Sequence, residues 1–234
     1  MRTYTTSKGA EISYAELNPG YICAVSQGIL GKLENALVVP RTELDHFFML
    51  YHYDFLADDW IIIESIAKGV SIGWLSWYTK LTPVHIYRPN DSDSDNICNI
   101  CLLAATNAIS YGRRYYDFPT MARVAYITLH EIFKQLMKGK RPWVSYTCYP
   151  AVKDNAVICT ELVAQSFRKA GYNVFNPYCL ANPPNFISCL VEGIVEEVGV
   201  IPPTSPNRFK MFMYRLGASM LKESISSEKR RINY

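Results

Sequence analysis

The sequence has no apolar run that approaches the ~18 residues of a membrane span. Its first residues, Met1 to Gly9, carry charge but no apolar stretch, so they do not resemble a signal peptide. No strong excess of one charge is present either: 24 Lys and Arg stand against 21 Asp and Glu, which gives no indication of a nucleic-acid partner. From these absences we expect a cytoplasmic protein with no membrane span. Signal-independent export, or incorporation into a particle, stays open.

The seven cysteines are an odd number without regular spacing, which is typical of reduced thiols rather than of a disulfide framework. Cys98 and Cys101 form one CxxC pair, but no second pair or histidine stands at zinc spacing. We therefore expect no metal and no cofactor, with a zinc protein as a distant alternative. A hydrophobic content of 49% in 234 residues predicts a sizeable core within one domain, with room for an appendage.

Strand patterns dominate the first part of the chain. The apolar and aromatic runs predict strands over 20–25, 47–53, 60–66 and 84–88. Asp58 and Asp59 mark a hairpin turn, and Gly69 is expected to end the third strand. A loop with a short helical turn is expected over 26–45.

Helix patterns dominate the second part. They predict helices over 97–111 and 120–138, and a further helix that contains Cys159 and ends at Gly171. A short strand is expected over 143–148. Two more helical stretches are expected near 186–198 and 206–223, followed by a polar tail over 224–234. The sum is an α+β fold, with an antiparallel sheet packed against helices.

Cys159 is the first candidate for chemistry, because it lies where a short apolar run becomes a helix. We expect Asp154 or Asn155 to cap that helix, which places the thiol in its first turn. There the exposed N–H groups and the helix dipole stabilise a thiolate and could hold an oxyanion. From the helix alone, a small buried core thiol is the more common role of such a residue.

His46 begins the aromatic strand pattern and is the candidate base for Cys159. His52 is a competing candidate, because in an unbroken strand it points to the same face. His85 and His130 have no supporting motif. Glu64 interrupts the apolar run that begins at Trp60, so it either pairs with an imidazole on the adjacent strand or ends the strand in water.

Seven blocks of the chain resemble, in order, the circularly permuted branch of the NlpC/P60 papain-like superfamily, with the YiiX/YebB-like peptidases and amidases as the nearest group. The Cys159-Thr160-Glu161-Leu162-Val163 block resembles the family's Cys-Ser-Glu-Leu-Val segment and is the most specific. The other blocks are Gly20-Tyr21-Ile22, Asp45-His46-Phe47-Phe48-Met49, Ile62-Ile63-Glu64-Ser65 with Gly69-Val70, Val84 to Arg88, Gly112 to Phe118, and Asn182 to Ser188.

The resemblance implies a cysteine hydrolase with Cys159 as nucleophile, His46 as base and Glu64 as the residue that orients the base. It implies a permuted papain-like fold over residues 1–190, with a helical insertion at about 118–150. Residues 191–234 then form a C-terminal helical extension and tail. Asp45 stands where the family usually has Ser or Thr, and the insertion is longer than the family pattern.

The implied substrate is a peptide-like amide, for example in peptidoglycan. Hydrolysis of a lipid ester or thioester, or acyl transfer to another acceptor, is the alternative on the same fold. A third alternative is a non-catalytic module of a larger assembly, which the insertion or the C-terminal helices could join. Neither the substrate nor the oligomeric state follows from the sequence.

Overall fold

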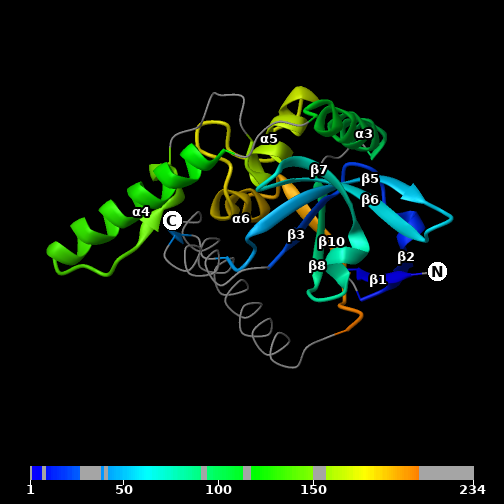
Figure 1. Cartoon of the computed structure of the whole chain (residues 1–234), viewed down its shortest axis with the longest axis horizontal. Coiled ribbons are helices and arrows are strands. Elements are labelled where there is room, and N and C mark those ends of the chain that lie inside the picture. The colour runs from blue at the N-terminus through cyan, green and yellow to red at the C-terminus, as the bar shows by residue number, and fades with distance from the viewer. Residues whose placement is uncertain are drawn as a thin grey trace.

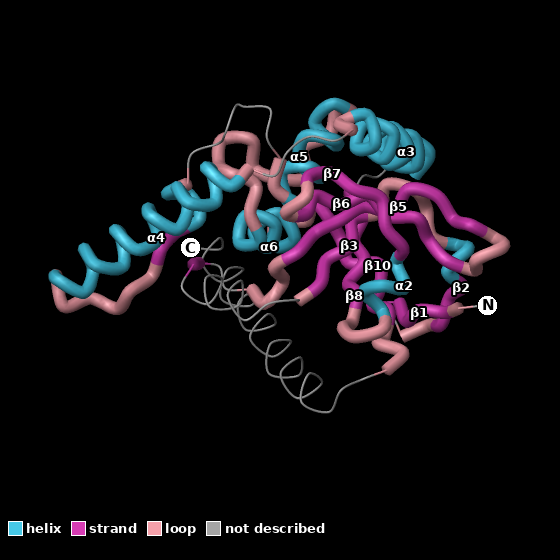
Figure 2. The backbone as a smooth tube through the Cα atoms, viewed as in Figure 1, coloured by secondary structure: helices cyan, strands magenta, loops and turns pink. Residues whose placement is uncertain are grey.

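An eight-stranded antiparallel sheet with helices packed against it forms the body of the protein (Figures 1 and 2). The computed structural model describes residues 2–6, 9–26, 38–39, 42–90, 94–112, 117–149 and 157–205. The strand order is β2-β1-β10-β8-β3-β5-β6-β7, so the N-terminal strands and β10 pair at one side of the sheet. The strands are β1 (Thr3–Thr6), β2 (Glu11–Ser13), β3 (Ile22–Val25), β5 (His46–Asp54), β6 (Asp59–Ile66), β7 (Gly69–Trp74), β8 (Val84–Pro89) and β10 (Val195–Ile201).

The helices lie mostly in the second half of the chain, with β9 (Val144–Ser145) and β10 among and after them. They are α2 (Leu75–Thr79), α3 (Ser94–Ser110), α4 (Phe118–Met137), α5 (Cys159–Lys169) and α6 (Pro183–Val191), with short 3-10 turns at Tyr14–Glu16 and Tyr146–Cys148. A two-residue strand, β4 (Val38–Val39), pairs in parallel with β9 (Val144–Ser145). Within the described residues, no helix combines the length and the apolar character needed to cross a bilayer.

Strands β5 and β6 form an antiparallel hairpin. Strand β5 is rich in aromatic residues and β6 in β-branched isoleucine, and both residue types favour a pleated, buried surface. Asp58 turns the chain between them with a positive φ of 49°, a conformation that Asp tolerates. The turn predicted at Asp58 and Asp59 is therefore confirmed.

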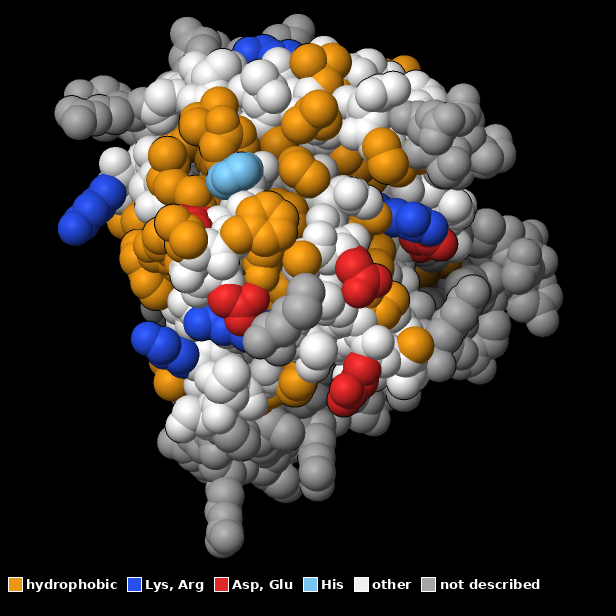
Figure 3. All heavy atoms as spheres, turned by 90° about the vertical axis from the view of Figure 1, so that its right-hand side faces the viewer, with side chains coloured by type: hydrophobic (Ala, Val, Ile, Leu, Met, Phe, Trp, Pro, Cys, Tyr) orange, Lys and Arg blue, Asp and Glu red, His pale blue; other side chains and the backbone are white. Residues whose placement is uncertain are grey.

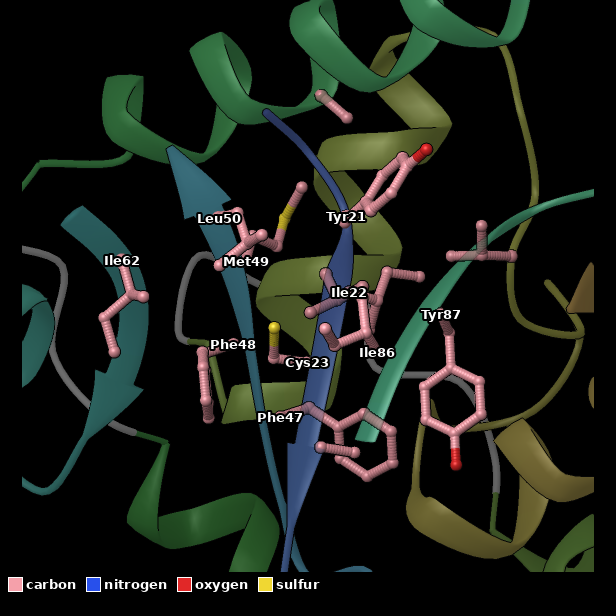
Figure 4. Close-up of a cluster of buried hydrophobic side chains, with 14 of the residues drawn as sticks. Tyr21, Ile22, Cys23, Phe47, Phe48, Met49, Leu50, Ile62, Ile86 and Tyr87 are labelled. Carbon is pink, nitrogen blue, oxygen red and sulfur yellow. The ribbon is translucent and has the colours of Figure 1, made fainter. Parts of the chain in front are cut away.

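The main core lies where α3 and α5 pack against the sheet. Ile22 and Cys23 of β3 are fully buried between the side chains of β5 and β8 (Figure 4). Gly20, just before β3, has a positive φ of 81°, and a Cβ there would lie 1.9 Å from the Cys101 carbonyl oxygen. Only glycine lets α3 approach the sheet so closely at this point.

A second, smaller core joins α4 to the body. Val124 on α4 packs with a set of buried apolar side chains that comprises Val38, Val144, Tyr149, Ile158 and Leu180. Because Ile158 immediately precedes Cys159, one face of α4 is fixed close to the start of α5. The rest of α4 extends away from the sheet (Figure 1).

Most of the predicted elements are confirmed, with four corrections. The helix predicted near 186–198 is wrong beyond Val191, because Val195–Ile201 is strand β10 between β1 and β8. Gly69 begins β7 rather than ending β6, which already ends at Ile66. Only Val144 and Ser145 of the strand expected over 143–148 are extended. The loop expected over 26–45 contains strand β4.

Strands β1 and β2 were not predicted from the sequence. The expected helical turn within 27–37, the helix near 206–223 and the tail over 224–234 all lie outside the described residues.

Candidate active site

His46 and Glu64 meet on one face of the β5–β6 pair. Phe48 pairs directly with Glu64, so His46, two residues earlier, lies diagonally across from the carboxylate on the same face. The imidazole Nε2 is 2.9 Å from Glu64 Oε2, and both side chains are buried. Of the two alternatives that the sequence left open, Glu64 therefore pairs with an imidazole on the adjacent strand rather than ending the strand in water.

A tyrosine that sequence analysis missed completes this group. The Tyr78 hydroxyl, carried on α2, donates to Glu64 Oε2 and lies 3.1 Å from His46 Nε2. Its ring stacks on Phe48, with the ring centroids 4.6 Å apart. No motif in the sequence marks Tyr78, because a five-residue helix after an edge strand has no periodic signal.

Cys159 is the first residue of α5, as its position in the sequence suggested. The N-cap is Ile158, which makes no side-chain capping bond among the described residues. The cap predicted at Asp154 or Asn155 is therefore wrong, and both of these residues lie outside the described part of the chain. Because Ile158 has an apolar side chain, the N-cap residue itself offers no acceptor to the N–H groups of the first turn, which are the donors that stabilise an anion at a helix start.

Buried polar contacts hold the start of α5 in place. The Ser65 hydroxyl of β6 donates to the Val157 carbonyl at 2.5 Å, which ties the approach to α5 to the sheet. The Thr160 hydroxyl donates to the Ala181 carbonyl at 2.5 Å, and the Ala181 N–H donates to Glu161 Oε1 at 3.1 Å. Burial raises the pKa of Glu161 above its usual range, while the Ala181 N–H partly offsets this. Thr160, where the family pattern has Ser, thus anchors the helix.

The imidazole of His46 interacts both with Glu64 on β6 and with Cys159 at the start of α5. Burial lowers the pKa of His46, but hydrogen bonds to Cys159 and Glu64 outweigh it and raise the pKa to about 10. Since Nε2 faces Glu64 and Tyr78, Nδ1 is the ring nitrogen left for the thiol. Cys159, His46 and Glu64 are thus brought together, with the imidazole between the thiol and the carboxylate.

The other histidines are separate from this group. A β-bulge between Leu50 and His52 shifts the register within β5. The regular alternation that would put His52 on the same face as His46 is therefore broken, and His52 is exposed. His85 Nδ1 pairs with Glu197 Oε1 at 2.7 Å, across β8 and β10. His130 lies exposed on α4.

The CxxC pair shows no sign of a metal site. Cys98 is exposed while Cys101 is buried in the core, where burial raises the pKa of its thiol to about 12. Across the described ranges, no three His, Cys, Asp or Glu side chains converge as metal ligands.

Comparisons with known proteins add little to this geometry. No family model matches the chain, and no curated protein matches it in sequence. Among solved structures, the chain is similar to the metalloprotein YiiX from Escherichia coli O157:H7, at 14% identity and a TM-score of 0.40. That similarity covers 78% of this chain and 88% of the other, but it is too weak to carry an argument about function.

Proposed function

We propose that the protein is a cysteine hydrolase of the permuted papain-like type, with Cys159 as nucleophile, His46 as base and Glu64 as the residue that orients His46. The observation that supports this most is the position of the imidazole between a thiol at a helix start and a buried carboxylate. A raised histidine pKa beside a thiol favours the thiolate–imidazolium pair, which is the reactive form of such sites. Tyr78 acts as a positioning residue, because its hydroxyl bonds to both groups.

The proposed reaction follows from these positions. The Cys159 thiolate attacks the carbonyl carbon, and the oxyanion that forms faces the N–H groups at the start of α5. His46 gives its proton to the leaving amine as the carbon–nitrogen bond breaks, which leaves a thioester on Cys159. Neutral His46 then takes a proton from water, the hydroxide attacks the thioester, and the acid is released as Cys159 recovers its thiolate and His46 keeps that proton. Glu64 stabilises the imidazolium throughout.

We propose a peptide-like amide as the substrate, for example in peptidoglycan, as the sequence resemblance implies. The same steps would cleave an ester or thioester, which is the alternative. For the domain that carries the site, we propose a boundary after Ile201 rather than after residue 190, because β10 pairs with β1 and β8.

Thiol alkylation tests the proposal against an internal standard. Cys98 is exposed on α3 and serves as the reference thiol, whereas Cys159 is buried, with 8% of its surface exposed. At about pH 6, limiting iodoacetamide should label Cys159 at least about tenfold faster than Cys98, because only a stabilised thiolate is populated there. Peptide mapping by mass spectrometry gives both rates from one sample.

The variant His46→Ala separates the proposed role from simple exposure. Loss of the imidazolium should remove the fast labelling of Cys159 and leave Cys98 unchanged. Equal rates at the two cysteines in the unaltered protein, or fast labelling of Cys159 that survives in His46→Ala, would refute the proposed catalytic pair and favour a non-catalytic module.

A further inference from the structure

Helix α4 presents an apolar stripe to solvent along its outer side. Its side chains recur at helical spacing and are between 56% and 74% exposed: Tyr126, Leu129, Phe133, Leu136 and Met137. Spacings of three and four residues place them on one face. The helix lies at one end of the molecule, away from the sheet (Figure 1).

The opposite face of α4 is the one that packs on the body. Val124 and Thr128 are buried there, and the Thr128 hydroxyl bonds to the Tyr149 hydroxyl. A surface helix usually carries polar residues opposite its buried face. An apolar stripe in that position therefore indicates a surface that another body covers.

Cations flank one side of the stripe and its C-terminal end. From Phe118 to Trp143 the sequence has five Lys and Arg and one acidic residue, against 24 and 21 in the whole chain. The remainder of the chain is thus slightly acidic, and the net positive charge is concentrated here. The five are exposed: Arg123, Lys134, Lys138, Lys140 and Arg141.

The far end of α4 adds a hollow that suits an anionic group. This open hollow has a volume of about 560 Å³, and its lining includes the cationic side chains of Lys134, Lys138, Lys140 and Arg141 together with Trp143. Glu131 is its one acidic lining residue and pairs with Lys134 at 3.5 Å. The Trp143 backbone is fixed there, because its N–H donates to the Gln135 side chain at 2.7 Å. Trp and Lys side chains are commonly found at the membrane interface, where the acyl chains of the lipids meet the headgroups.

We propose that the outer face of α4 is a docking surface for an anionic lipid bilayer, with the stripe in the acyl boundary and the cations on the headgroups. An apolar face flanked by Lys and Arg, on a helix that does not span, is the pattern of an interfacial helix. The predominantly positive charge, with Glu131 as the one acidic residue of this segment, favours negatively charged lipid over a protein surface of mixed charge. This docking does not depend on catalysis at Cys159.

The face at the opposite end of the molecule, as far as the described residues form it, lacks this combination. At the other end of the molecule apolar groups are also visible, but basic and acidic side chains are interspersed among them (Figure 3). The β5–β6 turn there exposes Phe55 and Leu56, at 78% and 100%. That turn therefore provides a matched control of similar apolar exposure.

Vesicle flotation tests the proposal with the full chain. The protein should float with vesicles in which about one-third of the phosphatidylcholine is replaced by phosphatidylserine, and added salt should weaken this binding. Pure phosphatidylcholine vesicles should bind at least about tenfold more weakly. Equal binding to both vesicle types would overturn the proposal.

Two double variants locate the binding surface. Leu129→Glu with Phe133→Glu should reduce flotation at least about tenfold, because charge replaces the buried apolar contact. Phe55→Ser with Leu56→Ser should leave it unchanged. Flotation that survives in the α4 variant would refute the assignment, provided that its far-ultraviolet circular dichroism matches the unaltered protein.

A second copy of the chain is the rival occupant of the stripe. Sedimentation equilibrium decides between them: a dimer that dissociates in the α4 variant, without lipid-dependent flotation, would overturn the membrane proposal. The proposal is also separable from the proposed enzyme activity. Cys159→Ala should still float, and the α4 variant should still show fast labelling of Cys159.

Discussion

His46 Nε2 lies 2.9 Å from Glu64 Oε2, with the two side chains held on adjacent strands of one sheet. The orientation of the imidazole is therefore set by the fold, and the same imidazole also interacts with Cys159, which raises the pKa of His46. Since each strand is fixed by register on both sides, the pair is preorganised before any substrate binds.

Glu64→Gln should lower the pKa of His46 from about 10, because it removes one of the two groups that raise it while burial continues to lower it. In an NMR pH titration, the midpoint of the His46 imidazole signal should fall by at least about one unit. Glu197→Gln is the matched control, since it removes the carboxylate partner of His85 outside the site. An unchanged pH profile in Glu64→Gln would show that the carboxylate does not act on His46.

His46 should also make stability depend on pH in a defined direction. Its pKa is raised on folding, so the folded state binds the proton more tightly than the unfolded state. The stabilisation is fully present below the unfolded pKa of about 6.5 and is lost as the pH rises through the folded pKa. In urea titrations, the difference in unfolding free energy between the unaltered protein and His46→Gln should shrink between these two values. A difference that grows with pH would contradict the assignment.

Tyr78→Phe should keep the ring stacked on Phe48 while removing the hydroxyl bonded to Glu64 and His46. Loss of one hydrogen bond to a charged group costs about 1.5–3 kcal/mol, so Cys159 alkylation near neutral pH should slow about tenfold or more. Tyr53→Phe is the control, because it removes a hydroxyl–carboxylate contact with Asp58 at the distant turn. If both variants altered the alkylation rate equally, Tyr78 would have no specific role at the site.

Gly20→Ala should destabilise the protein severely, by more than about 3 kcal/mol, because it combines a positive φ with a steric conflict. The added Cβ would meet the Cys101 carbonyl at 1.9 Å and force α3 away from the sheet. Gly112→Ala has a positive φ but no atom within 4 Å of the added Cβ, so it should cost only about 1 kcal/mol. Chemical denaturation measures both, and equal losses would show that the α3 contact is not responsible.

The elements that the sequence predicted correctly are those with strong local patterns. The aromatic and β-branched runs of β5 and β6 and the periodic face of α3 required no knowledge of partners. Strand β10 was mistaken for helix because its glutamates and valines fit either state, and only pairing with β1 and β8 decides it. The short strands β1 and β2 were missed for the same reason.

The sequence by itself determined the α+β class and the presence of a thiol at a helix start, a histidine at a strand start and a carboxylate in a buried run. Those features depend on local residue pattern, which the chain carries directly. Only the tertiary structure decided that His46 rather than His52 meets Glu64, because a bulge at the middle of β5 breaks the alternation. Only the tertiary structure brings Tyr78 against His46, and only it leaves the apolar stripe of α4 exposed. Contacts between distant segments determine which faces are buried, and the local sequence does not carry them.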